Sequence, residues 1–231
     1  QIVGFRAPEL KPGGDTMARA LQENGFLYDS SMIETGHPPR YPYTFEYRKE
    51  SFCHVQPCPY DNGYPGLWEI PVIQWQHYRT GDLFGSPYEY TPFNFDDAKK
   101  YFQFNFNRHY EISRAPFNIN IHTRWFDDNP FVFDALTEFI QETLELGDVY
   151  FVKQSQAIQW MKTPIPSQNA TLFDLFDCPS SITLPGPEPC FIGEANNCVY
   201  DVCGEKIAMQ TCAPCPPHFP FVRNTDGELG E

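Results

Sequence analysis

The stretch from Arg114 to Met161, RAPFNINIHTRWFDDNPFVFDALTEFIQETLELGDVYFVKQSQAIQWM, decides the fold class of this chain. Near its start, Phe117, Ile119 and Ile121 alternate with polar residues that end in His122. A period of two is typical of a β-strand with one apolar face and one polar face. We therefore expect a strand over residues 117–122, with His122 at its C-terminal end.

The rest of this stretch predicts a helix, a second strand and a second helix. Apolar residues recur at helical spacing from Val132 to Leu144, behind Pro130 and ahead of Gly147, which suit a first helical position and a C-cap. Residues 149–152 then predict a strand, and residues 155–161 a helix. Alternating strands and helices are typical of a parallel α/β architecture, in which ligands bind at the C-terminal ends of the strands.

Length and charge exclude several classes of protein. The 231 residues suit one large domain, or one domain with a tail. The net charge of −14 argues against binding to nucleic acid or to an anionic membrane surface. No apolar run approaches the roughly 20 residues of a membrane-spanning helix. The opening residues QIVGF lack the basic start of a signal peptide and predict a strand cut at its beginning, so we expect a further segment upstream.

Eight cysteines and one glycosylation sequon indicate a secreted protein with disulfide bonds. Cys53 and Cys58 form a local candidate pair in a long loop-rich region, and Asn169 opens the sequon Asn-Ala-Thr. The other six cysteines lie in the last quarter of the chain: Cys178, Cys190, Cys198, Cys203, Cys212 and Cys215. A zinc site is the alternative for part of this set, because Cys212 and Cys215 have the spacing of metal ligands.

The histidines provide one candidate acid or base. No two of the six histidines lie within four residues of each other, and no phosphate-binding loop, dinucleotide-binding motif or Gly-x-Ser-x-Gly motif occurs. His122, at the expected strand end, is the best candidate for proton transfer. The alternative is a buried histidine that hydrogen-bonds to Asn118 or to a backbone carbonyl.

Several motifs, in order, resemble those of the polysaccharide deacetylases, above all the invertebrate chitin deacetylases and their deacetylase-like relatives. The third motif region of that family is matched by residues 3–8 (VGFRAP), 13–15 (GGD) and 25–31 (GFLYDSS). The fourth and fifth are matched by residues 67–71 (LWEIP) and 114–122 (RAPFNINIH). The likeness continues through residues 148–152 (DVYFV), 159–161 (QWM), 211–216 (TCAPCP) and 218–221 (HFPF).

This resemblance implies a distorted (β/α) barrel that uses zinc to remove acetyl groups from polymers of N-acetylglucosamine such as chitin. In the family, a metal polarises the acetamide carbonyl and activates water, and a carboxylate acts as the base. His122 matches the histidine that protonates the leaving amine, and Arg6 matches the arginine that orients the base. Trp68 matches a tryptophan that lines the sugar groove. Core packing is the alternative for Trp68, and a structural ion pair for Arg6.

The departures from the family pattern are equally informative. The motif with two aspartates and the motif with two histidines four residues apart, which hold the metal and supply the base, are absent from this chain. Both stand upstream of Gln1 in the family order. Glu9 stands where the family usually has an aromatic residue. Glu69 is a weak substitute for the fourth-motif aspartate, and together with Trp68 it is our candidate for substrate binding. We therefore expect the metal ligands on a partner, the N-terminal half of the same precursor.

Two functional hypotheses follow. In the first, residues 1–166 are the C-terminal part of a polysaccharide deacetylase barrel, residues 167–231 are a tail stapled by disulfides, and the protein is part of a secreted chitin deacetylase. In the second, the protein is a catalytically silent deacetylase-like scaffold, or a chitin-binding protein of the extracellular matrix. Glu9 and the missing fourth-motif aspartate favour the second hypothesis a little.

Overall fold

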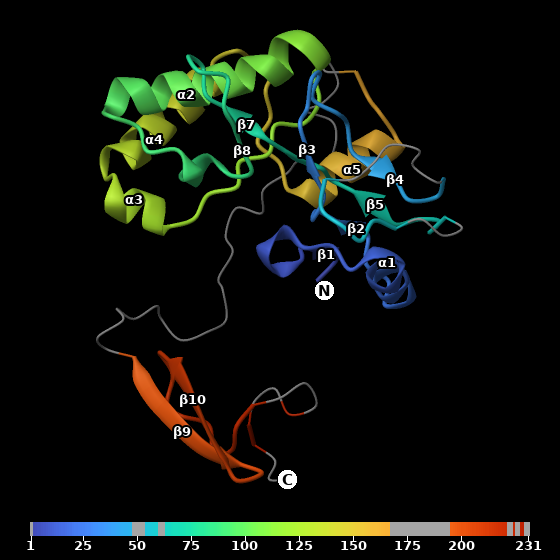
Figure 1. Ribbon diagram of the computed structural model, residues 1–231, viewed down its shortest axis with the longest axis vertical. Helices are drawn as coiled ribbons and strands as arrows, with labels where there is room; N and C mark the ends of the chain where they lie inside the picture. Colours follow the sequence, from blue (N-terminus) through green and yellow to red (C-terminus); the bar gives the residue numbers. More distant parts are fainter. Residues whose placement is uncertain are drawn as a thin grey trace. The chain divides into compact units, whose positions relative to one another are not determined.

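The computed structural model describes residues 2–47, 54–59, 63–166, 195–220, 224, 227 and 228. The chain divides into two compact units, Gln1–Asp177 and Cys178–Glu231 (Figure 1). Among the described residues, no helix is long and apolar enough to cross a membrane. The predicted cysteine and glycosylation positions Cys53, Asn169, Cys178 and Cys190 lie outside the described residues.

The larger unit contains eight short strands and several helices in the described residues. The strands are β1 (Gly4–Phe5), β2 (Tyr28–Asp29), β3 (Ile33–Glu34), β4 (Tyr43–Thr44), β5 (Trp68–Glu69), β6 (Val72–Ile73), β7 (Trp75–Gln76) and β8 (Leu83–Phe84). The α-helices are α1 (Gly14–Glu23), α2 (Phe95–Asn107), α3 (Arg124–Asp128), α4 (Phe131–Leu144) and α5 (Gln154–Lys162). The larger unit also contains two 3₁₀-helices, η1 (Pro8–Leu10) and η2 (Pro87–Glu89), and one π-helix, η3 (Arg108–Ser113), among the described residues.

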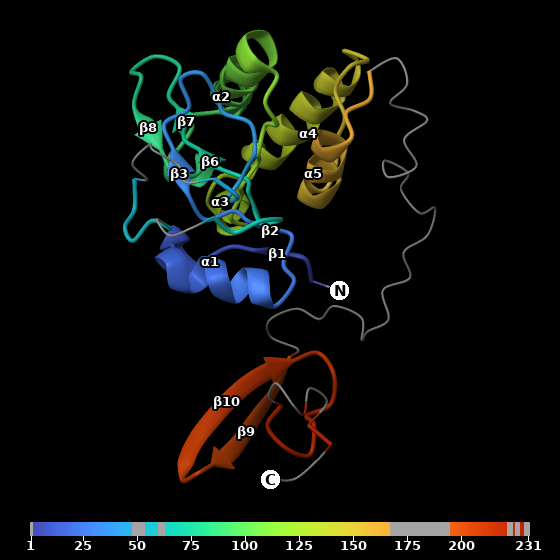
Figure 2. The same cartoon turned by 90° about the vertical axis from the view of Figure 1, so that its right-hand side faces the viewer.

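A parallel ladder runs through the first half of this unit. The sheet order is β1-β2-β5-β4, with β1, β2 and β5 parallel and β4 antiparallel. Beyond β2 and β5 the same two chain segments stay paired, because the Val72 amide donates to the Met32 carbonyl at 2.8 Å and β3 pairs with β6 in parallel. Figure 2 shows these strands between α1 and the other helices. The expectation of parallel strands mixed with helices is confirmed here, although the structure does not establish a closed barrel.

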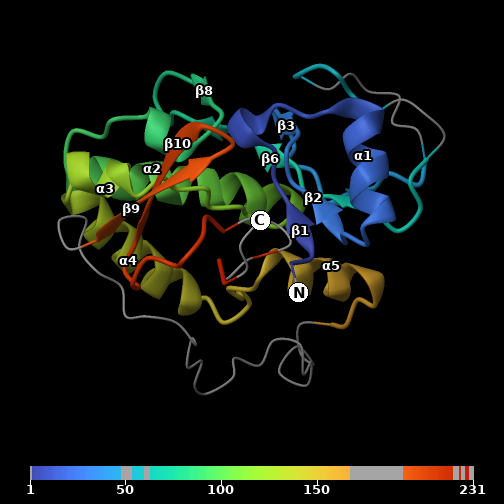
Figure 3. The ribbon, with the colours of Figure 1, turned by 90° about the horizontal axis from the view of Figure 1, so that it is seen from below.

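α1 covers one side of this ladder (Figure 3). Its buried Ala18 and Leu21 belong to a cluster that includes Leu67, next to β5, with Phe5 of β1 packed against it. Trp68 follows Leu67, and successive side chains of a strand point to opposite faces. Trp68 therefore lies on the sheet face away from α1, in a row with Tyr28 and Gly4.

α2 and α4 form the second and larger core. Asn94 caps α2 by accepting from the Asp97 amide at 2.9 Å, and acidic residues in the first turn suit the positive end of the helix dipole. The rings of Phe102 and Phe139 stack with their centroids 5.6 Å apart, joining α2 to α4. Trp75 of β7, which is 2% exposed, packs on this pair of helices through Phe102. Aromatic packing therefore holds the helical half of the unit together.

The predictions for residues 114–161 are half confirmed. The two expected helices are present as α4 and α5, and Gly147, at φ +77°, follows the end of α4. The expected strands over 117–122 and 149–152 are wrong, because neither segment is part of a strand in the described structure. Phe117, Ile119 and Ile121 do pack against the helical core as their alternation predicted. The apolar face was therefore correct, but no neighbouring strand among the described residues provides the backbone partners that a ladder requires.

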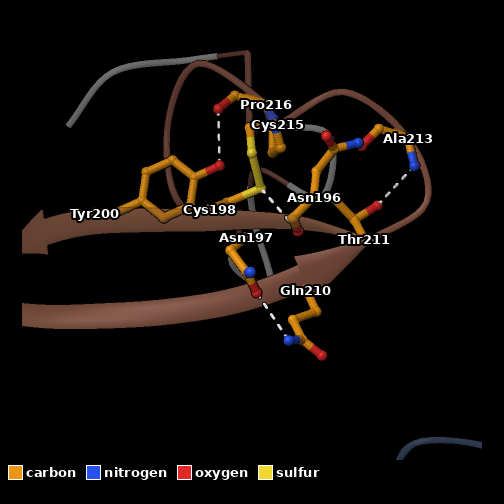
Figure 4. The surroundings of a disulfide bond; sticks show 9 residues. All are labelled: Asn196, Asn197, Cys198, Tyr200, Gln210, Thr211, Ala213, Cys215 and Pro216. Carbon is orange, nitrogen blue, oxygen red and sulfur yellow. Dashed lines mark hydrogen bonds between the residues drawn. A yellow bond between two sulfur atoms is a disulfide. The ribbon is translucent and has the colours of Figure 1, made fainter. Parts of the chain in front are cut away.

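The smaller unit contains an antiparallel hairpin, β9 (Asn196–Val202) with β10 (Glu205–Thr211). A disulfide joins Cys198 of β9 to Cys215, and Tyr200 donates to the Pro216 carbonyl at 2.8 Å (Figure 4). The disulfide ties the segment after β10 back to β9, which stabilises a hairpin that would be marginal alone.

The cysteine predictions need two corrections. Cys203 is a free, exposed thiol rather than half of a disulfide, because it lies in the tight turn between β9 and β10 at φ +51°. Cys212 and Cys215 are both disulfide-bonded, and a disulfide sulfur is not the thiolate that zinc binds, so the zinc alternative is wrong. Cys58 is also disulfide-bonded, as predicted.

Phe102→Ala tests the helical core. Phe102 is 0% exposed and contacts the rings of Trp75, Trp125 and Phe139. Truncation leaves a cavity, so we expect the free energy of unfolding to fall by about 3–5 kcal/mol in chemical denaturation. Phe93→Ala, at a ring that is 79% exposed, is the control and should change it by about 0.5 kcal/mol or less. Equal losses in the two variants would contradict this description of the core.

Candidate functional site

The ends of the parallel strands carry a cluster of polar side chains. Arg6 directly follows β1, Ser30 and Ser31 follow β2, and Asp29 and Glu69 are the last residues of β2 and β5. Parallel strands bring their C-terminal ends to one edge of the sheet, so residues that are far apart in sequence meet there. The sequence analysis expected a ligand site at the C-terminal end of a strand, but it placed His122 there, and His122 ends no strand in the described structure.

Three hydrogen bonds hold the guanidinium of Arg6. Its Nε donates to the Ser30 carbonyl and its Nη2 to the Ser30 hydroxyl, both at 2.8 Å. Its Nη1 donates to Oδ1 of Asn120 at 2.6 Å. Ser30 is itself fixed, because its hydroxyl donates to the Ile70 carbonyl at 2.8 Å. Within the described part of the chain, Arg6 is therefore held by neutral acceptors from two distant segments and forms no direct ion pair of the kind that the structural alternative requires.

Asp29 and Glu69 form a buried pair of carboxyl groups that interact electrostatically with Arg6. They are 1% and 0% exposed. Ser31 donates to Oδ1 of Asp29 at 2.6 Å, and the Met32 amide donates to Oε1 of Glu69 at 3.1 Å. Oδ2 of Asp29 and Oε2 of Glu69 are buried without a further partner among the described residues. Burial raises the pKa of both groups, and the neighbouring Asp29 charge raises the pKa of Glu69 further. A hydrogen bond between the two carboxyl groups lowers the pKa of Asp29 and raises that of Glu69. We therefore assign a proton to this pair, on Glu69.

His122 lies at the surface. Its side chain is exposed, and its Nδ1 accepts from the Arg124 amide at 3.2 Å. When Nδ1 accepts, the proton of a neutral imidazole is on Nε2, which then points away from this turn. The alternative of a buried, structurally satisfied histidine is therefore wrong for His122.

A cavity of about 380 Å³ lies beside His122. Its lining residues are Tyr88, Thr91, His122, Arg124, Trp125, Asp128 and Asn129. Tyr88 is 46% exposed, and its ring centroid lies 5.6 Å from that of His122. Trp125 is buried, and its Nε1 donates to the Tyr90 carbonyl at 2.9 Å. The cavity combines an accessible aromatic face with charged groups at its rim, which suits a polar ring with one apolar face.

Sequence reasoning proposed Arg6 and His122 as site residues but did not single out Asn120 and Tyr88, which contact them in the structure. Tyr88 belongs to η2, in an aromatic loop without a motif, and it meets His122 only through the fold. The only feature of the sequence that could have pointed to Tyr88 is its place in an aromatic-rich loop. Asn120 could have been found more easily, because it lies two residues before His122 on the polar side of the alternation.

The other two predicted site residues are less accessible. Trp68 is half-buried, and Glu69 is fully buried. Because strand neighbours point to opposite faces, the two side chains do not line a common surface. Glu69 instead accepts a hydrogen bond from the Met32 amide inside the protein, and its complete burial keeps it from contacting a polymer.

The described residues do not form a metal centre by themselves. No group of three or more His, Cys, Asp or Glu side chains among them is arranged to hold a metal ion. The buried pair of Asp29 and Glu69 has no third ligand of that kind within the described ranges. A zinc site of the family type would therefore need ligands from outside these residues.

Glu69→Gln tests the protonated pair. A carboxyl group with a raised pKa in the folded state stabilises the fold at low pH, and this contribution is lost as the pH rises above the ordinary value of 4.5 toward the raised value. The free energy of unfolding should therefore fall with rising pH more steeply in the wild type than in Glu69→Gln, measured by urea unfolding between about pH 5 and 9. The exposed Glu145→Gln serves as the control. Parallel curves for the wild type and Glu69→Gln would contradict the assignment.

Comparison with known proteins identifies the family. No protein-family model matches the chain. Chitin deacetylase 1 of Bombyx mori is 31% identical over 243 residues, which cover 98% of this chain and 44% of that protein. Chitin deacetylase 8 of the same organism is 29% identical over 239 residues, which cover 98% of this chain and 59% of that protein. The chain thus spans about half the length of the curated relatives it matches, and it belongs to the chitin deacetylase-like polysaccharide deacetylases.

Proposed function

We propose that this chain is the C-terminal portion of a secreted chitin deacetylase, which hydrolyses the acetamide of N-acetylglucosamine units in chitin. Its partner in this proposal is the N-terminal half of the same precursor, which brings zinc, the metal ligands and the catalytic base. The observation that carries the proposal is the arrangement of Arg6 and His122. Arg6 is fixed at the strand edge through Asn120, two residues before an exposed His122.

Two residues of this chain have direct roles in the proposed reaction. Hydrolysis breaks the bond between the acetyl carbon and the amide nitrogen, and the departing nitrogen requires a proton. His122 is proposed to donate this proton from Nε2, the ring nitrogen that does not face the Arg124 amide. Of the five N–H donors of Arg6, three are used within the described residues. The remaining two suit a carboxylate, which is the group expected as the base.

The cavity beside His122 is proposed to bind a sugar ring. Tyr88 offers a half-exposed aromatic face at its edge, and pyranose rings stack on such faces through their C–H groups. The ion pair of Arg124 and Asp128, at 3.5 Å, lies in the same lining and provides donors and acceptors for hydroxyl groups. Tyr88 takes the role in this proposal that the sequence assigned to Trp68.

Exposed apolar residues support a missing partner segment. Leu144 and Leu146, at the end of α4, are 51% and 47% exposed, and Phe151 and Val152 are 47% and 38% exposed. A cavity of about 400 Å³ lies nearby, with Phe151, Val152 and Ile119 in its lining. Large apolar side chains left exposed in one part of a chain are often found where another protein segment binds. We propose that the N-terminal half covers it.

The second candidate is the silent scaffold or chitin-binding matrix protein. It is favoured by Glu9, which replaces an aromatic residue of the family motif and forms an exposed ion pair with Lys11. A protein of this kind binds the polymer through Tyr88 but has no deacetylase activity. Sequencing of any chain that co-purifies with this one distinguishes the two, because only the enzyme needs a partner with the aspartates and the histidine pair.

His122→Ala tests the enzymatic proposal. In the precursor that contains both halves, we expect kcat for deacetylation of a chitin oligomer to fall by about 100-fold or more, because the leaving amine lacks its proton donor. Zinc content, measured by atomic emission, should stay unchanged, since His122 is not a ligand in this proposal. The exposed His37→Ala is the control. Activity retained in His122→Ala would remove this residue from the mechanism, and an inactive wild type would favour the scaffold.

Tyr88→Ala tests the sugar site. Loss of one stacking face should raise KM, or the Kd for a chitin oligomer, by about 5- to 10-fold, with kcat reduced much less. The Kd is measured by calorimetry, and this measurement tests the sugar site whether the protein is an enzyme or a catalytically silent scaffold. Tyr47→Ala, at a side chain that is 77% exposed and outside the cavity lining, is the matched control. Unchanged binding in Tyr88→Ala would rule out this cavity as the sugar site.

A further inference from the structure

Asn120 connects two parts of the candidate site that are far apart in sequence. Its Oδ1 accepts from Nη1 of Arg6 at 2.6 Å, across a separation of 114 residues. Its backbone carbonyl accepts from the Ser86 hydroxyl at 3.0 Å, just before η2. Two residues further on, His122 meets Tyr88 of η2. The segment that carries His122 is therefore attached both to the strand edge and to the wall of the sugar cavity.

The alternation of residues 117–121 explains why Asn120 reaches Arg6. Phe117, Ile119 and Ile121 pack against the helical core, so the intervening asparagines are directed toward other segments. Asn118 accepts from Nε2 of Gln154 at 3.1 Å, and Asn120 accepts from Arg6. The same residue type thus makes two separate connections, which provides a matched pair for an experiment.

The bond to Asn120 completes the fixation of Arg6. Ser30 holds the edge of the guanidinium formed by Nε and Nη2, and Asn120 holds the opposite nitrogen. A long side chain has many rotamers, and each additional bond restricts them. The carboxamide is a neutral acceptor, so it restrains the guanidinium without neutralising its charge. An aspartate in the same place would form an ion pair with Arg6 and compete with any other carboxylate.

We propose that Asn120 is a positioning residue: it orients Arg6 relative to His122 through a neutral acceptor and leaves the charge of Arg6 for the carboxylate base. This inference rests on the proposed function, because the base belongs to the N-terminal half. It concerns the orientation of Arg6 and involves no contact between Asn120 and the substrate.

Kinetics of the two-half precursor provide the first test. Asn120→Ala should lower kcat for a chitin oligomer by about 10-fold or more with KM within about twofold, because orientation is lost and substrate contacts remain. Asn120→Asp should also lower kcat, since it retains the bond but neutralises Arg6. Asn118→Ala, the matched control, should stay near the wild-type rate. Wild-type kcat in Asn120→Ala or in Asn120→Asp would overturn the proposal, and so would an equal loss in Asn118→Ala.

Proton exchange of the Arg6 guanidinium provides a test that does not depend on activity. In the ¹⁵N-labelled chain, the Nε–H signal of Arg6 is assigned by its absence in Arg6→Ala. Exchange with solvent should be several-fold faster in Asn120→Ala than in the wild type, and unchanged in Asn120→Asp and Asn118→Ala. Unchanged exchange in Asn120→Ala would overturn the proposal. Faster exchange combined with an inactive wild-type precursor would instead refute the proposed function and leave the Arg6–Asn120 contact established.

Discussion

The parallel pairing of the segments around β2 and β5 is the constraint on which the rest of the larger unit depends. Parallel strands must be joined by a crossover, and their C-terminal ends must meet at one edge. Arg6, the Ser30–Ser31 pair and the buried carboxyl groups gather at that edge for this reason. α1 can cover only one face of the ladder, so the face that bears Trp68 is left for other contacts. The position of the candidate site is thus a consequence of strand direction.

Hydrogen bonds and a shared proton stabilise the buried carboxyl groups of Asp29 and Glu69 at this edge. The charge of Arg6 lies near two carboxyl groups that are almost fully excluded from water, and Asp29 is the one that stays charged when Glu69 holds the proton. Burial of two adjacent carboxylates is very unfavourable, which raises their pKa and keeps a proton between them. The serine hydroxyls hold the strand ends in register around this pair. A rigid polar edge of this kind is suited to orienting a charged side chain, which is the property a catalytic edge requires.

Two segments of this unit have the sequence of strands without their pairing. Residues 117–121 have the correct apolar face and pack on the core, yet no strand lies beside them in the described structure. The alternation of a strand depends only on its own residues, whereas its hydrogen bonds require a neighbour. The exposed apolar side chains of Phe151 and Val152 line the same cavity as Ile119 of this unpaired region. Both observations agree with a chain that spans only about half the length of its relatives.

The sequence by itself determined the helices α4 and α5, the apolar side of residues 117–121, and Arg6 and His122 as candidate site residues. Each of these depends on local periodicity or on a motif of a few residues. Only the tertiary structure decided that Tyr88 lies beside His122, that Asn120 binds Arg6, that Glu69 is buried, and that Cys203 has no disulfide. These facts depend on which distant segments become neighbours. That choice is made by strand pairing and by the packing of α2 against α4, which no local pattern contains.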